Sequence, residues 1–106
     1  MRGAARHKQV SETEEFASWF ESLKDQRSRG VITARIQRLA SGNPGDVKPV
    51  GQGVSELRIH HGPGYRVYYF ERDGELVVLL CGGDKDSQRK DVRRAKALKK
   101  EVEKDG

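Results

Sequence analysis

The sequence contains a single cysteine, Cys81, and no run of apolar residues long enough to span a membrane. One cysteine excludes an intramolecular disulfide and is typical of proteins in a reducing cytoplasm. A membrane span needs about 18 or more consecutive apolar residues, and the first residues also lack the apolar segment of a signal peptide. We therefore expect a cytoplasmic protein in which Cys81, at the end of an apolar run, is a buried thiol.

The signatures of several kinds of active site are missing as well. No cysteine, histidine or carboxylate residues have the spacing of a metal site, and no Ser-His-Asp arrangement or phosphate-binding P-loop is present. The Gly82-Gly83 pair is explained by a turn between a strand and a helix. We predict neither a metal nor a cofactor, so the candidate chemistry must come from basic and titratable side chains.

Apolar residues are scarce and positive charge is unevenly placed. Apolar residues make up 34% of the chain and charged residues 35%, which predicts one domain, residues 1–106, with a small core covered by long charged side chains. Residues 1–84 hold 12 Lys and Arg against 11 Asp and Glu, whereas residues 85–106 hold 9 against 5. This basic segment favours a polyanionic or acidic protein partner, although a solvated helix face would have the same composition.

Two amphipathic helices are predicted within residues 11–41. Ser11 to Glu14 have the pattern of a capping box. The apolar residues that follow at helical spacing are Phe16, Trp19, Phe20 and Leu23. The aromatic residues could form a platform for stacking bases, but at this spacing we assign them to the core. A second stripe predicts the other helix of a hairpin, and its members are Ile32, Ile36 and Leu39.

The segments around these helices carry weaker signals. Residues 1–5 resemble a leader, and Arg6 to Val10 could form a short edge strand. Residues 42–53 contain four glycines and two prolines, a composition that predicts a loop.

Residues 54–81 predict an antiparallel β-meander. Three runs rich in Val, Ile, Leu, Tyr and Phe are separated by short turn sequences at residues 61–64 and 73–74. A thin apolar stripe at residues 92, 95, 98 and 102 then predicts a basic helix over residues 86–104, which a partner could complete. We therefore predict an α+β fold of two layers, a helix hairpin packed on the meander, followed by a C-terminal basic helix.

The register of the predicted strands collects polar side chains on one face. Because side chains alternate along a strand, Arg58 and His60 share a face, and Arg66 and Tyr68 alternate with apolar residues on the next strand. Arginine binds phosphate through two nitrogens, and histidine, with an ordinary pKa of about 6.5, can move a proton near neutral pH. These groups would suffice for RNA cleavage in which a 2′-hydroxyl attacks the neighbouring phosphate.

Cationic residues flank this polar face. Lys48 and Lys85 are placed to bind neighbouring phosphates, and Arg89 and Arg93 of the last predicted helix could contact RNA further along. The same sequence pattern would also be produced by arginine and histidine residues that lie on a solvent-exposed sheet face and have no catalytic role.

Three motifs taken together resemble a known family. They are GVSELR at residues 53–58, GPGYRVY at residues 62–68 and LVVLLCGGDK at residues 76–85. In this order and spacing they resemble the RelE/ParE toxin superfamily, and within it the HigB-like branch described as addiction-module killer or phage-derived Gp49-like proteins. The similarity spans about residues 13–98 and includes the loop at residues 42–49.

The resemblance implies a toxin of a type II toxin–antitoxin system. RelE and HigB members cut messenger RNA, commonly on the ribosome, and are neutralised by an antitoxin, here expected to be a HigA-like helix-turn-helix protein. Arg66 matches the family's transition-state arginine, Arg58 and His60 fall at its basic strand positions, and Lys85 matches a basic residue after the last strand.

One departure from the family pattern leaves alternatives open. RelE uses a tyrosine on its terminal helix, whereas residues 89–94 contain none. His60, or Tyr68 in its place, would then have to serve as the base. Two other functions fit the same resemblance: inhibition of DNA gyrase, as in ParE members, and nucleic-acid binding by a relative that has lost catalysis.

Overall fold

The computed structural model describes residues 7–105, which form five strands and three helices. In chain order these are β1 (Gln9–Glu12), α1 (Glu14–Ser22), α2 (Gln26–Ala40), β2 (Val47–Gly51), β3 (Val54–Ile59), β4 (Tyr65–Arg72), β5 (Leu76–Gly83) and α3 (Gln88–Asp105). The α+β prediction, with two N-terminal helices, a meander and a C-terminal helix, is confirmed. The proposed leader at residues 1–5 lies outside the described residues.

The five strands form one mixed sheet in the order β1-β5-β4-β3-β2. Strands β3, β4 and β5 pair antiparallel as the predicted meander, while β1 pairs parallel with β5 at one edge. The predicted edge strand is present as Gln9–Glu12, and Arg6, where the prediction began, lies outside the described residues. Because β1 takes in Ser11, the predicted capping box is wrong. Thr13 caps α1 instead, and its hydroxyl oxygen accepts a hydrogen bond from the Phe16 amide at 3.0 Å.

The stretch predicted as a loop at residues 42–53 contains an additional strand. Strand β2 pairs antiparallel with β3 and forms the other edge of the sheet, with Lys48 opposite Glu56 and Pro49 opposite Ser55. Proline is accepted on an edge strand because its missing amide hydrogen can face away from the partner strand. The glycine and proline content suggested a loop. At the edge of the sheet, however, a proline in β2 need not interrupt the hydrogen bonds between strands.

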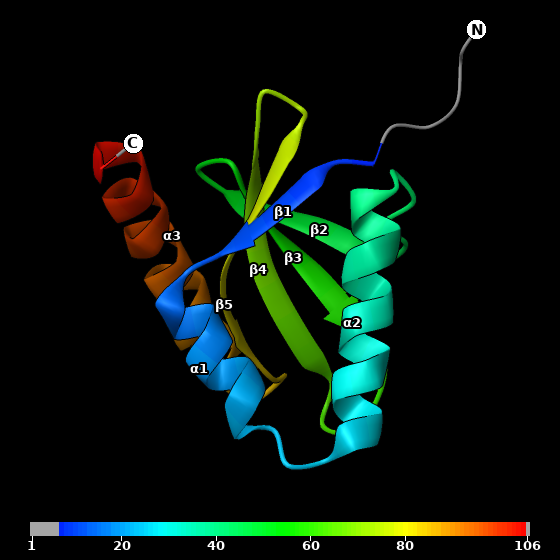
Figure 1. Ribbon diagram of the computed structural model, residues 1–106. Helices are drawn as coiled ribbons and strands as arrows, with labels where there is room; N and C mark the ends of the chain where they lie inside the picture. The colour runs from blue at the N-terminus through cyan, green and yellow to red at the C-terminus, as the bar shows by residue number, and fades with distance from the viewer. Residues whose placement is uncertain (1–6, 106) are drawn as a thin grey trace, which may run out of the picture.

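Helices α1 and α2 cover one face of the sheet, as Figure 1 shows. Phe16 of α1 and both Ile32 and Leu39 of α2 are buried against Leu57 and other apolar residues of the central strands. Trp19 and Phe20 pack on this cluster and are partly buried. The aromatic stripe is therefore a core stripe, as predicted.

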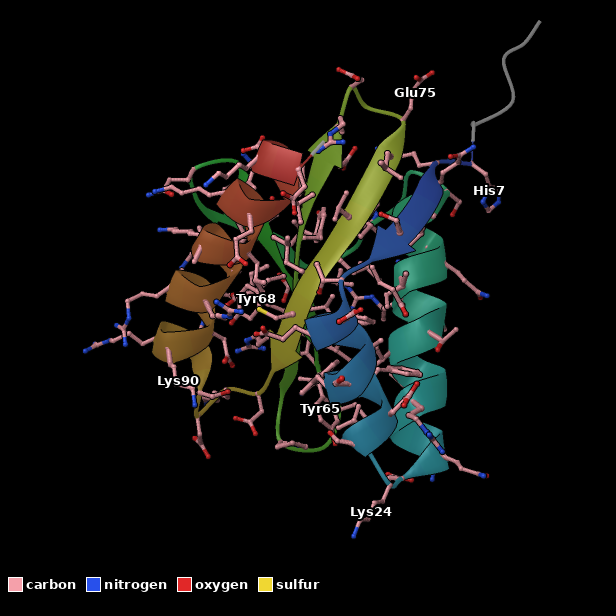
Figure 2. The ribbon with its side chains drawn as sticks, turned by 60° about the vertical axis from the view of Figure 1, so that its left-hand side comes forward. His7, Lys24, Tyr65, Tyr68, Glu75 and Lys90 are labelled. Atoms are coloured by element: carbon pink, nitrogen blue, oxygen red, sulfur yellow. The ribbon has the colours of Figure 1, made fainter. Side chains whose placement is uncertain are left out.

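Helix α3 covers the opposite face, so the sheet lies between helices (Figure 1). Ala95 and Leu98 are buried in a second apolar cluster with Tyr68 and Leu80. Figure 2 shows Tyr68 between the sheet and α3, while Lys90 extends outward from that helix. The two-layer expectation left one sheet face open, whereas α3 adds a third layer and places the polar strand residues beside a helix.

An irregularity in the pairing of β4 with β5 shapes this second cluster. Tyr68 pairs with Cys81 and Tyr69 with Leu79, so Leu80 is an extra residue on β5. Such a bulge interrupts the alternation of side chains, and both Leu80 and Cys81 belong to the cluster under α3. β5 is apolar from Leu76 to Cys81 because both of its faces are buried, and the bulge places Leu80 and Cys81 on the same side.

Candidate functional site

A buried carboxylate lies at the centre of the polar residues on the α3 side of the sheet. Glu56 of β3 is fully buried, and its Oε2 accepts hydrogen bonds from the Tyr68 hydroxyl at 3.0 Å and from Gln88 Nε2 at 2.8 Å. Its Oε1 accepts a hydrogen bond from Arg58 Nε at 3.0 Å. Burial raises the pKa of Glu56, but the hydrogen bonds from Arg58, Gln88 and Tyr68 and the charge of Arg66 outweigh it, so the pKa lies below its ordinary value.

The two arginines predicted to bind phosphate lie side by side above this carboxylate. Arg58 and Arg66 are directly opposite each other in the β3–β4 pair, which places their side chains on the same face. Arg66 Nε lies 4.0 Å from Glu56 Oε1, and the whole residue is only 9% exposed. This nitrogen is buried and has no hydrogen-bond partner among residues 7–105. Two of the predicted site residues are therefore neighbours in space.

The first turn of α3 closes one side of this arrangement. Gly83 of β5 pairs with Arg66, and a side chain at Gly83 would overlap the Asp91 carboxylate and approach the Ser87 hydroxyl. The Ser87 hydroxyl is hydrogen-bonded to the Asp91 carboxylate. A glycine at this position therefore allows α3 to begin close to Arg66.

His60, directly after β3, is paired with a carboxylate. Its Nε2 lies 2.7 Å from Asp46 Oδ2, and the imidazole side chain is 72% exposed. This hydrogen bond lowers the pKa of Asp46 below its ordinary value. When Nε2 carries the hydrogen that Asp46 accepts, Nδ1 is left free to take a proton from another group.

Arg35 of α2 holds together the chain segments that carry this pair. Its guanidinium donates to the carbonyl oxygens of Arg58 at 2.7 Å and of Pro44 at 2.8 Å. The Arg58 amide in turn donates to the Asp46 carbonyl at 2.9 Å. These bonds fix the segment before β2 against the end of β3, where His60 and Asp46 meet.

A hollow of about 440 Å³ lies at the β3–β4 turn. The residues that line it are His60, His61, Gly62, Pro63, Gly64, Arg66 and Lys85. It brings together three of the predicted site residues, which come from the end of β3, the start of β4 and the segment after β5. His61, which the strand register ranked below His60, lines the same hollow because the chain has already turned at that position.

Other predicted site residues do not line the hollow. Lys48 is exposed on β2 and lies opposite Glu56, on the same face as the arginines. Arg89 and Arg93 are exposed on α3. These cations could contact a polyanion that extends beyond the hollow.

Tyr68 has a different environment from the one expected of a base. It is fully buried, its hydroxyl donates to Glu56, and burial together with the Glu56 charge raises its pKa above the ordinary value. A substrate in the hollow does not reach such a hydroxyl, so we assign Tyr68 to the support of Glu56 and omit it from the chemistry.

Two residues of this site were missed by sequence reasoning. Glu56 has a signal in the sequence, because it shares a strand face with Arg58 and lies opposite Tyr68 once the two strands are paired. Gln88 has no such signal, since its contact with Glu56 depends on how α3 packs on the sheet.

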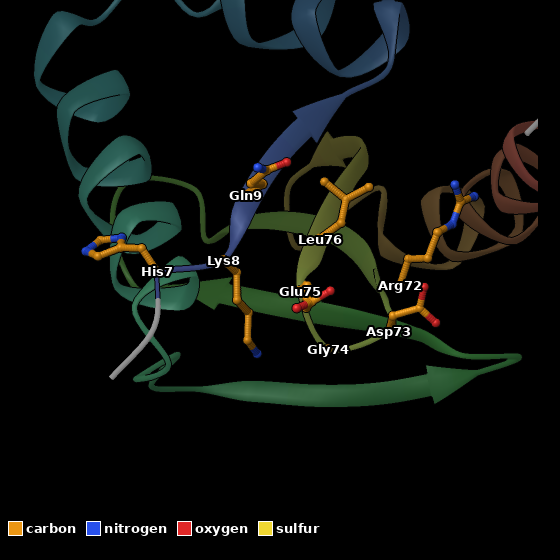
Figure 3. Close-up of a pocket in the computed structure, with 8 residues that line it drawn as sticks. All are labelled: His7, Lys8, Gln9, Arg72, Asp73, Gly74, Glu75 and Leu76. Atoms are coloured by element: carbon orange, nitrogen blue, oxygen red, sulfur yellow. The ribbon is translucent and has the colours of Figure 1, made fainter. Parts of the chain in front are cut away.

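A second hollow, of about 430 Å³, lies at the other end of β4 (Figure 3). The residues that line it are His7, Lys8, Gln9, Arg72, Asp73, Gly74, Glu75 and Leu76. Acidic and basic side chains are mixed there, and Lys8 Nζ donates to Glu71 Oε1 at 2.6 Å. Arg66 and Arg72 are six positions apart, which corresponds to about 20 Å along a strand. This hollow is therefore separate from the arginine pair.

Three further observations bear on the sequence predictions. Cys81 is buried, as expected, and burial raises the pKa of its thiol to about 12. Within residues 7–105, no group of three or more His, Cys, Asp and Glu side chains is arranged to hold a metal ion. In the same part of the chain, no helix is long and apolar enough to cross a membrane.

Comparison with known proteins places the chain among relatives. It matches the family described as phage derived protein Gp49-like (DUF891) over residues 18–103. A protein of Haemophilus influenzae, described as an uncharacterized protein, is 51% identical over 94 residues, which cover 89% of this chain and 95% of that protein.

A solved structure shares the fold. The toxin–antitoxin complex RelBE2 of Mycobacterium tuberculosis matches with a TM-score of 0.59 and 19% identity, covering 74% of this chain and 91% of the matched chain. At this identity the match shows a RelE-like fold. Together with the family match, which spans most of the sequence, it confirms the resemblance predicted from the three motifs. The chain belongs to the phage-derived Gp49-like family.

Proposed function

We propose that this protein is the toxin of a type II toxin–antitoxin system and that it cuts messenger RNA at the hollow beside Arg66. The observation that carries the proposal is the meeting of Arg66, His60 and Lys85 around one hollow, with Arg58 directly opposite Arg66. Family membership and the RelE-like fold support the assignment to toxins.

Arg66 and Arg58 would bind the phosphate that is cut. A guanidinium matches the geometry of phosphate oxygens, and two adjacent guanidiniums provide the positive charge that a pentavalent phosphorane needs as it gains negative charge. Because these charges come from side chains, the proposed reaction needs no metal ion.

His60 would move the proton. In the proposed step the imidazole takes the proton of the 2′-hydroxyl, and the 2′-oxygen attacks the adjacent phosphorus. The bond to the 5′-oxygen breaks, and that oxygen takes a proton from solvent water and leaves as a 5′-hydroxyl. The other product ends in a 2′,3′-cyclic phosphate, and the imidazolium returns its proton to solvent. The carboxylate of Asp46 at 2.7 Å supports this role because it stabilises the imidazolium that forms.

The outer cations would bind the rest of the RNA. Lys85 lines the hollow, and Lys48 is exposed on the same sheet face. Arg89 and Arg93 extend the positive surface along α3. Such contacts hold phosphates without reading sequence, so any preference for a cleavage site must come from the messenger RNA in its ribosomal context or from contacts closer to the hollow.

An antitoxin is the proposed protein partner. The matched RelBE2 structure is a toxin–antitoxin complex, and the family resemblance suggests a HigA-like helix-turn-helix protein. An acidic or apolar segment of such a partner would complement the basic surface of α3 or cover the arginine pair.

Purified protein tests this proposal directly. It should cut messenger RNA in a translating extract and leave 5′-hydroxyl ends. The same RNA without ribosomes shows whether the ribosome is required. Intact RNA in both conditions, with wild-type protein shown to be folded, would contradict the proposal.

A further inference from the structure

We propose that Glu56 is a positioning residue for both arginines. It accepts a hydrogen bond from Nε of Arg58, and its charge lies beside Nε of Arg66, so that the terminal nitrogens of both face the phosphate. The inference rests on the proposed function only for the identity of the ligand. The arrangement of the three side chains can be tested without any RNA.

The burial of Glu56 excludes direct contact with a substrate. The side chain is 0% exposed, although a buried carboxylate is strongly unfavourable unless it is paired and hydrogen-bonded. Donors from β3, β4 and α3 contact its two oxygens. A charge that is buried at this cost and fully partnered must act through the groups that it contacts.

The geometry of the two arginines shows which edge of each guanidinium faces Glu56. A guanidinium is planar and can donate through its Nε side and through its outer Nη edge. Arg58 uses Nε to bind Glu56 Oε1 at 3.0 Å, and Arg66 Nε lies 4.0 Å from the same oxygen. Both contacts to Glu56 involve Nε, so neither uses an Nη group. Those outer edges are therefore free to bind phosphate.

The carboxylate also explains how the sheet accepts two arginines directly opposite each other. Like charges at opposed positions of an antiparallel pair are destabilising. Arg58 and Arg66 occupy such positions, and a single negative charge lies next to both Nε atoms. Glu56 therefore offsets a repulsion that would otherwise turn the arginines apart.

The opposite oxygen of Glu56 is fixed by other elements. Tyr68 from β4 and Gln88 from the first turn of α3 both donate to Oε2. Because both oxygens are held, the carboxylate cannot rotate to follow a moving arginine. The position of α3 is thereby linked to the position of the arginine pair.

The main test substitutes Glu56→Gln, which removes the charge and keeps the shape, and uses Glu71→Gln as the matched control. Glu71 is an exposed glutamate on β4 whose carboxylate is paired with Lys8. The Nε–H signals of Arg58 and Arg66 are followed by NMR in ligand-free protein, and single-turnover RNA cleavage is measured alongside.

In folded Glu56→Gln protein, we expect the Nε–H signals of both arginines to shift. The Nε–H of Arg58, whose hydrogen bond to the carboxylate is weakened, should also exchange with water at least tenfold faster. Because a displacement of about 1 Å at a reacting centre can lower a rate about 100-fold, we expect a loss of that order in the cleavage rate with little change in KM. Glu71→Gln should match the wild type in both measurements. A purely structural role would lower thermal stability without changing the Nε–H signals of the folded protein.

Gln88→Ala provides a second variant in case Glu56→Gln does not fold. It removes one donor to Oε2 and leaves the charge in place, so it should accelerate Nε–H exchange to a smaller extent. Unchanged arginine signals in folded Glu56→Gln, or in Gln88→Ala if only that variant folds, would overturn the inference. If the signals change as expected while wild-type protein cuts no RNA, the positioning role stands and the proposed ribonuclease function fails.

Discussion

Glu56 and Tyr68 lie opposite each other on β3 and β4, and the buried Tyr68 hydroxyl donates a 3.0 Å hydrogen bond to the buried Glu56 carboxylate. This pair lies between the arginines and the apolar cluster under α3. The pair therefore joins the polar site to the core of the protein. Substitutions in the pair can show whether these residues stabilise the site or take part in the reaction.

Tyr68→Phe should lower stability and leave most of the cleavage activity. A hydrogen bond to a charged group contributes about 1.5–3 kcal/mol, and we expect a decrease of this size in the free energy of unfolding measured with urea. A catalytic base would contribute about 100-fold or more to the rate. A loss of that size in stably folded Tyr68→Phe protein would show that the tyrosine acts in the chemistry.

The stability of the protein should decrease in acid. The pKa of Glu56 lies below its ordinary value of 4.5 when the protein is folded. A carboxyl whose pKa is lowered by folding stabilises the fold above its unfolded pKa, and this contribution is lost as the pH falls through the folded pKa. The free energy of unfolding should therefore fall as the pH drops below about 4.5.

Glu56→Gln identifies the part of this pH dependence that belongs to Glu56. The carboxyls of Glu15, Asp25 and Asp46 also have lowered pKa values, so a residual acid dependence should persist in the variant. Urea unfolding at several pH values between 3 and 7 measures both proteins. Identical slopes below pH 4.5 would contradict the assignment of a charged, paired Glu56.

Gly83→Ala should disturb the start of α3. A methyl group there would overlap the Asp91 carboxylate and approach the Ser87 hydroxyl, so the hydrogen-bonded Ser87 and Asp91 side chains must shift beside Arg66. Overpacking of this kind costs about 1–3 kcal/mol in the free energy of unfolding, and RNA cleavage should fall with it.

Gly30→Ala is the matched control for that substitution. Gly30 lies in α2, and nothing lies within 4 Å of where its Cβ would be. Alanine is favoured over glycine in a helix by about 0.8–1 kcal/mol, so this change should raise stability and leave cleavage unchanged. Equal effects of the two changes in a thermal unfolding experiment would refute the packing argument.

Charge removal on α3 should weaken RNA binding without affecting stability. Arg89 and Arg93 are exposed on this helix. If both contact phosphates, replacing both with glutamine should reduce the slope of log K against log salt by about 1.4 on single-stranded RNA. Binding to a 2′-deoxy-substituted oligonucleotide, which cannot be cut, measures this slope between low and physiological salt. An unchanged slope would remove both residues from the proposed RNA path.

Local patterns predicted the parts of the fold that local forces determine. The two stripes that contain Phe16 and Ile32 each have helical spacing, and the runs within residues 54–81 are separated by strong turn signals. Both appear in the structure as expected. Strand β2 was missed because Pro49 and the nearby glycines suggest a loop, and only its pairing with β3 at the sheet edge makes it a strand.

In the candidate site too, local patterns predicted the strand positions but not the contacts that depend on tertiary packing. Alternation along β3 and β4 placed Arg58 and Arg66 on one face, and the register confirms that arrangement. The contact of Gln88 with Glu56 depends on where α3 packs on the sheet, and the local sequence pattern does not specify that position. The burial of Tyr68, named from the sequence as an alternative base, was not predicted for a related reason, since it follows from the helix that covers it.

The most direct measurement of the central claim is a map of new RNA 5′ ends in bacterial cells that express the wild-type protein, Arg66→Ala or Arg72→Ala. Arg72 lies at the far end of the same strand and serves as the control. We expect growth arrest and new 5′-hydroxyl ends within coding regions for the wild type and Arg72→Ala, and neither for folded Arg66→Ala. Arrest with intact messages and broken DNA would identify gyrase as the target instead. New ends produced equally by Arg66→Ala would contradict the proposed site.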